Sequence, residues 1–151
     1  MEKYLHLFAI SMVPLIELRG AMIYAAANDM PFLTSFICCV IGNMLPVPFL
    51  IKFSKGILLR LSKVNKIGWI FQKIIDRGNK KAAEIGGWEL LGLFLFVAIP
   101  LPGTGAWTGA LLASLLGVDI KKSSIAILCG LVIATIIMTV FSYGILGQLI
   151  H

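Results

Sequence analysis

Apolar residues fill most of the chain, and polar or proline-rich stretches interrupt them at a few places. Long apolar segments lie at 4–27, 32–51, 88–118 and 125–150. The second segment, about 20 residues long, can cross the apolar core of a bilayer. A short polar turn separates the first segment from the second, and another separates the third from the fourth. A basic stretch lies between the second and third segments. The pattern predicts an all-α integral membrane protein.

Proline breaks the first and third apolar segments. The first break runs from Pro14 to Gly20 and the other from Pro100 to Gly105, and Pro46-Val47-Pro48 predicts a kink in the second segment. A proline removes a backbone donor and clashes with the preceding turn, so the helix cannot run straight through it. Broken helices persist at membrane depth only where protein or a wet cavity satisfies the backbone. Paired breaks in two halves of a chain indicate a transporter binding site.

Composition supports a membrane location. Of the 151 residues, 59% are hydrophobic and 13% are charged, whereas soluble domains carry about 25% charged residues. The apolar run at the N-terminus continues past Glu17 and Arg19 without a cleavage site, so we expect no signal peptide. We expect one multi-pass domain, residues 1–151, in the inner or plasma membrane.

The positive charge is concentrated in the connector at 52–87. Nine of the 13 lysines and arginines lie between Lys52 and Lys81, opposed there by Asp76. A short basic block between membrane segments argues against nucleic acid as a partner and favours a cytoplasmic segment lying on anionic lipid headgroups. Apolar residues recur every three or four positions, which predicts an amphipathic helix at the membrane surface. The alternative is a cytoplasmic helical hairpin packed on itself.

The two halves have the same order of elements. Residues 4–51 and 88–151 each contain a broken segment, a short turn and a continuous span. The turn at 28–31 lacks lysine and arginine and should lie outside, whereas Lys121 and Lys122 should lie inside. Two re-entrant hairpins entering from opposite faces satisfy this, which predicts an inverted-topology repeat with both termini outside. The alternative is four simple spans with both termini on one side.

Three motifs resemble those of a known family. They are ELRGA at 17–21, GNMLPVP at 42–48 and PLPGTGAWTG at 100–109. Together they are similar to the small multi-drug export protein family, a distant relative of the DedA/VTT membrane proteins. The resemblance implies two opposed re-entrant helices and transport across or between leaflets, and DedA-type relatives are associated with lipid-linked phosphates and proton-dependent transport. In DedA-type proteins the arginines lie near the second hairpin, whereas this chain has no charge between Glu89 and Asp119.

The first break carries the charged part of the candidate substrate site. Glu17 and Arg19 are the only charged residues between Lys3 and Asp29, and a charge at membrane depth costs at least about 2.5 kcal/mol. Arg19 could bind an anionic headgroup through its planar donor fork. Glu17 could carry a coupling proton, because burial and a nearby arginine shift a carboxyl pKa in opposite directions. The alternative is a structural ion pair holding the hairpin tip.

The second break offers backbone groups rather than charge. Glycines allow close approach to a ligand, and a helix that restarts after Gly105 would point its N-terminal donors at an anion. Hydroxyl groups and an aromatic ring complete this part of the site, although small residues also permit tight packing of the two tips. Asn43 could line the same path. The predicted binding residues here are Asn43, Pro100, Pro102, Gly103, Thr104, Gly105, Trp107 and Thr108.

The sequence favours a transporter or lipid translocase for an amphipathic or lipid-phosphate substrate. It contains no catalytic motif, metal-ligand cluster or nucleotide loop, so we expect neither an enzyme nor a cofactor. Broad apolar sides and Gly130, Gly144 and Gly147 favour a homodimer surrounded by membrane lipids. The alternative function is a non-transporting scaffold whose basic helix recruits lipid or a protein. An ion channel is a third alternative.

Overall fold

The computed structural model describes residues 2–14, 16–61, 63, 69, 72–73, 76, 88–101 and 103–149. This part of the chain is helical and contains no strand. The helices are α1 (Glu2–Met12), α2 (Glu17–Ala27), α3 (Phe32–Met44), α4 (Val47–Leu61), α6 (Trp88–Ala98), α7 (Ala106–Leu116) and α8 (Ile120–Leu149). Most of the connector, including the apolar positions expected from Val64 to Ile75, lies outside the described residues.

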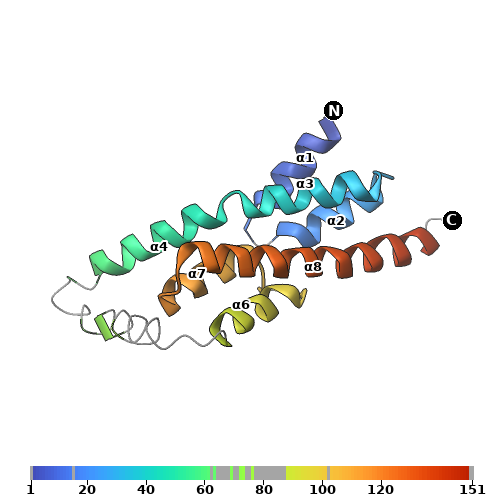
Figure 1. Ribbon diagram of the computed structural model, residues 1–151. Helices are drawn as coiled ribbons and strands as arrows, with labels where there is room; N and C mark the ends of the chain where they lie inside the picture. Colours follow the sequence, from blue (N-terminus) through green and yellow to red (C-terminus); the bar gives the residue numbers. More distant parts are fainter. Residues whose placement is uncertain are drawn as a thin grey trace.

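The long helices run antiparallel through the molecule. From the turn at 28–31, α3 and α4 lead to the opposite end, and α8 returns beside them (Figure 1). The predicted kink is present, since α3 ends at Met44 and α4 begins at Val47. Phe32–Ser54 and Ile120–Gly144 are long and apolar enough to cross a membrane.

Each proline-rich stretch lies between two short helices, α1 and α2 in the first case and α6 and α7 in the second. Each of α1, α2, α6 and α7 has 11 residues. The α1–α2 pair starts and finishes at the end of the molecule that holds the turn at 28–31, and the α6–α7 pair starts and finishes at the other end (Figure 1). The turns between the paired helices therefore lie toward the middle of the molecule.

The start of the last helix differs from the sequence prediction. Residues Asp119 to Ser124 were expected as a charged turn before a span at 125–150, whereas α8 begins at Ile120. The Asp119 carboxylate accepts hydrogen bonds from the backbone N–H groups of Lys121 at 3.0 Å and Lys122 at 3.3 Å. Because a capping aspartate satisfies the free donors of a first turn, the helix starts before the apolar run.

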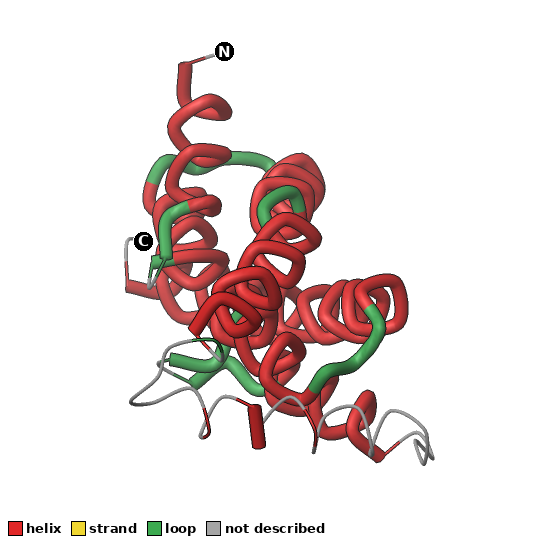
Figure 2. Tube along the Cα trace, turned by 90° about the vertical axis from the view of Figure 1, so that its left-hand side faces the viewer, coloured by secondary structure: helices red, strands yellow, loops and turns green. Residues whose placement is uncertain are grey.

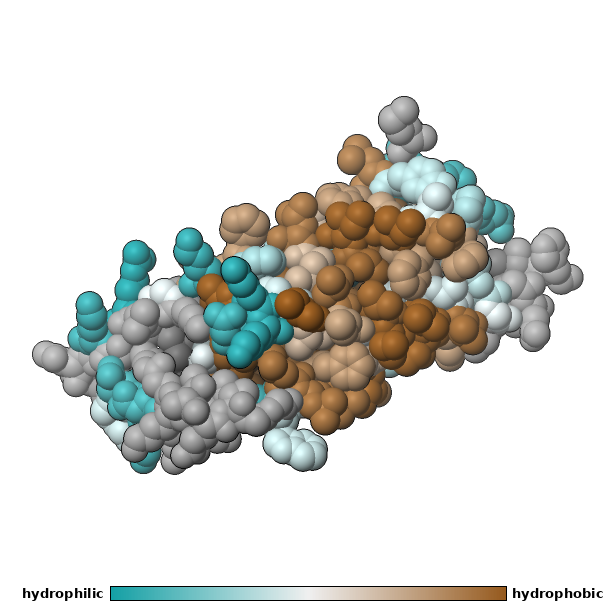
Figure 3. Space-filling model, viewed as in Figure 1, coloured by the Kyte–Doolittle hydropathy of each residue, from teal (hydrophilic) through white to brown (hydrophobic). Residues whose placement is uncertain are grey.

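Apolar side chains from all seven helices named above form one core. Its largest fully buried members are Leu7, Met22, Ile51, Leu93, Ile127 and Leu131. Many large apolar side chains are also exposed. On the face drawn in Figure 3, hydrophobic residues cover the middle and polar residues gather toward both ends. Gly130 packs inward on α6, where an added Cβ would lie 2.8 Å from the Phe94 carbonyl oxygen. It is therefore not free for a dimer contact, and the homodimer stays a prediction.

Candidate functional site

The two proline-broken stretches meet through polar side chains. Glu17 and Arg19 lie in the first turn of α2. Arg19 bonds to the segment that joins α6 to α7, and Glu17 bonds to the first turn of α7. Figure 2, turned by 90° from Figure 1, shows that helices make up most of the described chain and that short loops connect them. The groups in contact are separated by 85 to 90 residues in the sequence, so the tertiary fold alone brings them together.

Glu17 occupies the N-terminus of α7. Its side chain is only 4% exposed, and its Oε1 accepts a hydrogen bond of 3.1 Å from the backbone N–H of Trp107. The backbone of Ala106, the first residue of α7, also bonds to this carboxylate. Helix N-termini leave unpaired N–H groups and carry partial positive charge. The carboxylate therefore accepts a hydrogen bond from the first turn of α7, whose N–H groups have no acceptor within the helix.

The backbone at Glu17 adopts an unusual conformation. Its φ of 45° lies in the left-handed region, which residues with a Cβ adopt only at a cost of about 1–2 kcal/mol. Such conformations persist where the surroundings hold them, and they occur often at functional sites. At Glu17 this backbone conformation occurs in the residue whose carboxylate bonds to the N-terminus of α7.

Gly105 allows the carboxylate to come this close. A Cβ at Gly105 would lie 2.5 Å from Glu17 Cδ and 2.8 Å from Oε1, and it would overlap Oε2. No side chain fits in that space without moving the carboxylate. The glycine predicted to permit close approach therefore does so toward a residue of the same chain.

Arg19 bonds to the same loop through Thr104. Its Nη2 donates to the Thr104 carbonyl oxygen and, at 2.9 Å, to Thr104 Oγ1. That hydroxyl in turn donates to the Ile99 carbonyl oxygen at 2.6 Å, just beyond the end of α6. The Arg19 Nε is buried and has no partner among the described residues. Arg19 thus closes the loop and keeps one buried donor unused.

The indole of Trp107 completes the junction. Its Nε1 donates to the Met12 carbonyl oxygen at 3.1 Å, and Met12 is the last residue of α1. The sequence predicts an aromatic role for Trp107 but not this hydrogen bond to the Met12 carbonyl oxygen. The signal was available, because the last carbonyls of a helix that ends before a proline need partners from elsewhere.

The remaining predicted residues lie less centrally. Thr108 Oγ1 accepts from the Gly105 N–H at 2.9 Å and so supports the first turn of α7. Gly103 is exposed with φ of 84°, a value that suits a turn, and Pro100 is half-buried. Asn43 is fully buried in α3, and neither atom of its amide has a partner in the described part of the chain. Pro102 lies outside the described residues.

The chemistry available at this junction is anion recognition. The N–H groups of α7 and the guanidinium of Arg19 are donors that suit a carboxylate or phosphate, and Glu17 is the anion that occupies them in this structure. No group of three histidine, cysteine or acidic residues gathers anywhere in the described part. The junction therefore provides binding groups without a metal cluster.

Two apolar helices of spanning length and a largely apolar surface, together with the family matched below, point to a membrane protein. The family model described as "Putative small multi-drug export protein" matches residues 17–137. The chain belongs to this family, which confirms the resemblance found in the sequence, and the family description is that of an export protein. The relationship to DedA/VTT proteins stays a prediction. Neither the curated proteins nor the solved structures gave a match.

Proposed function

We propose that the protein is a small multi-pass transporter of the cell membrane, in which substrate passes at the junction of the two broken segments. The observation that carries the proposal is the bond from Glu17 to the N-terminus of α7, together with that from Arg19 to Thr104. Charges at membrane depth are costly and usually face a site or pathway. Here Glu17 and Arg19 lie between the two proline-broken segments, which would have to move apart for a substrate to pass.

The proposed topology has two re-entrant hairpins. Helices of 11 residues measure about 16 Å, roughly half of a hydrocarbon core of about 30 Å. The short helices before and after each break have this length. The fold-back of α1–α2 from one end and of α6–α7 from the other supports entry from opposite faces (Figure 1). Four simple spans would need each pair to run on through the molecule.

The packing of helices supports an inverted repeat. Helix α1 packs on α3, as α6 packs on α8, and each is the first helix of its half. The second helices cross to the other half, since α2 packs on α8 and α7 packs on α4. Inverted repeats of transporters place their binding sites between the halves, beside the ends of broken helices. This exchange puts the Glu17 junction at the proposed interface of the repeats.

Glu17 would act as an internal substitute for substrate. In the observed state its carboxylate fills the donors of α7. Protonation would remove its charge and weaken these bonds, because hydrogen bonds to charged groups are about twice as strong as neutral ones. An incoming anionic headgroup could then take the α7 donors and the unused Nε of Arg19. This exchange would couple a proton to a lipid-phosphate or similar amphipathic anion.

Reconstitution tests the proposal. Purified protein in vesicles is offered a panel of lipid phosphates and cationic drugs, with and without a pH gradient. We expect Glu17→Gln to abolish dependence on the gradient and Arg19→Ala to abolish transport of the anionic substrates. Lys121→Gln is the matched control, because Lys121 is exposed and lies beyond the C-terminal end of α7, whereas the junction is at the N-terminal end of that helix. Normal transport by both junction variants would refute the site.

The alternative function, a scaffold that recruits lipid or protein, is favoured by one observation. Lys52 and Arg60 are exposed on α4, where they could hold a partner without any transport. Under this alternative, charge removal on α4 abolishes activity in cells, and Glu17→Gln changes stability only. The vesicle assay separates the two, since a scaffold gives no flux with any substrate.

A further inference from the structure

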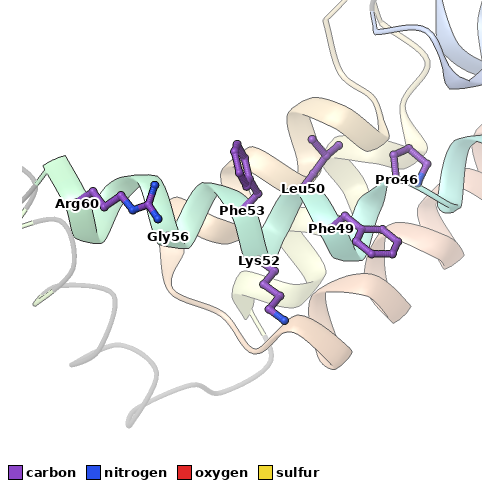
Figure 4. A pocket seen from close by; sticks show the side chains of 7 residues that line it. All are labelled: Pro46, Phe49, Leu50, Lys52, Phe53, Gly56 and Arg60. Carbon is purple, nitrogen blue, oxygen red and sulfur yellow. The ribbon is translucent and has the colours of Figure 1, made fainter.

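An open groove follows one side of α4 (Figure 4). Its volume is about 490 Å³, within the range of about 300–1,000 Å³ typical of ligand sites. The described residues that line it are Pro46, Phe49, Leu50, Lys52, Phe53, Gly56 and Arg60. Figure 4 shows that they all come from α4 and the residue just before it.

The groove changes character along its length. Phe49 and Phe53 are 72% and 69% exposed, and both lie within the spanning segment Phe32–Ser54. Arg60 lies beyond that segment, about 9 Å further along the axis than Ser54 at 1.5 Å per residue. An apolar floor inside the membrane thus leads to a cation at its surface. This order matches an amphiphile with its chain inward and its headgroup outward.

The charge on this helix is of one sign. Helix α4 carries Lys52, Lys55 and Arg60 and has no acidic residue. The Arg60 side chain lies back along the helix with its guanidinium toward Gly56 (Figure 4). A Cβ at Gly56 would meet nothing within 4 Å, so the space beneath the guanidinium is open. A guanidinium above open space suits a phosphate group, which it binds in a bidentate manner.

We propose that this groove binds one anionic phospholipid of the bilayer, with its phosphate at Arg60 and an acyl chain along Phe53 and Phe49. A zwitterionic lipid carries an ammonium group that offsets the charge of its phosphate, and free phosphate has no acyl chain. The groove shares no residue with the Glu17 junction, so the proposal stands or falls independently of transport. It assigns α4 the role of a lipid-anchored helix.

The test uses full-length protein in phosphatidylcholine nanodiscs titrated with phosphatidylglycerol, with bound lipid counted by native mass spectrometry. A basic residue near an anionic lipid surface changes affinity about five-fold, so we expect about five-fold weaker retention in Arg60→Gln. Gly56→Leu fills the open space without changing any charge. It should lower the retention of phosphatidylglycerol at least as much as the loss of the basic side chain does. Lys121→Gln/Lys122→Gln removes two exposed charges outside the groove and should retain lipid normally.

Three results would overturn the proposal. Equal retention by Gly56→Leu and the unchanged protein would mean that the groove is not the site. Equal losses in Arg60→Gln and the α8 control pair would mean attraction by net charge alone. Competition by inorganic phosphate at the same concentration as phosphatidylglycerol would mean that no acyl chain is recognised. All three proteins must insert, which the exposure of the altered residues permits.

Discussion

Replacing Gly105 by alanine tests the junction between the two breaks with a single methyl group. In the structure that methyl group would lie 2.5 Å from Glu17 Cδ and would overlap its Oε2. The backbone φ at Gly105 is −156°, an extended value that any residue adopts. The substitution therefore acts through the Glu17 carboxylate rather than through backbone strain.

The magnitude follows from the bonds that the carboxylate would lose. It must move away from the N–H of Trp107, with which it forms a bond of 3.1 Å, and from Ala106. Hydrogen bonds to a charged group contribute about 1.5–3 kcal/mol each. We expect Gly105→Ala to lower the free energy of unfolding by about 1.5–3 kcal/mol, since the bond to the Trp107 N–H is lost fully.

A double-mutant cycle isolates this contact. Glu17→Ala removes the carboxylate, so in that background Gly105→Ala should cost less than about 0.5 kcal/mol. Equilibrium unfolding in SDS–detergent mixtures, followed by tryptophan fluorescence, gives the four free energies. Gly92→Ala is the control, because nothing lies within 4 Å of its added Cβ and a glycine in mid-helix costs about 0.5–1 kcal/mol relative to alanine. An equal cost of Gly105→Ala in both backgrounds would refute the reasoning.

Three further substitutions test other contacts. Thr104→Val removes the hydroxyl that joins Arg19 to the Ile99 carbonyl oxygen and should cost about 1–3 kcal/mol in the same unfolding assay; a neutral result would contradict the bond network. Gly130→Leu should cost more than about 2 kcal/mol, because its side chain meets Phe94 and Val97 of α6, whereas Gly144→Leu, in open space, should be close to neutral. Tyr143→Phe removes a 2.8 Å bond to the Met30 carbonyl oxygen and should lower thermal stability by about 0.5–1.5 kcal/mol, with no change meaning that water replaces the bond.

Much of the fold could be predicted from hydropathy and proline positions. The breaks near Pro14 and Pro100 and the kink near Pro46 all appear, because a missing N–H acts locally and needs no knowledge of distant residues. The start of α8 was misplaced for the opposite reason. Hydropathy marks where the chain becomes apolar, whereas the Asp119 side chain decides where the helix begins.

The candidate site was only partly predictable. Sequence reasoning singled out Glu17 and Arg19 as costly charges and Gly105 as a point of close approach, and these residues do come together. It could not assign Glu17 to the donors of α7 or Trp107 to the Met12 carbonyl oxygen. Those pairings depend on how the two halves cross, which no local spacing encodes. Asn43, expected on the same path, is buried without a partner among the described residues.

The most direct test of the account is the distance between Glu17 Cδ and the Trp107 backbone nitrogen in a lipid bilayer. Solid-state NMR can measure it on protein labelled with ¹³C-glutamate and ¹⁵N-tryptophan. Because Oε1 lies 3.1 Å from that nitrogen, the account predicts a separation below about 4.5 Å that lengthens in Gly105→Ala. A separation beyond about 6 Å in the unchanged protein would mean that the carboxylate does not occupy α7 and that the two breaks do not form one site.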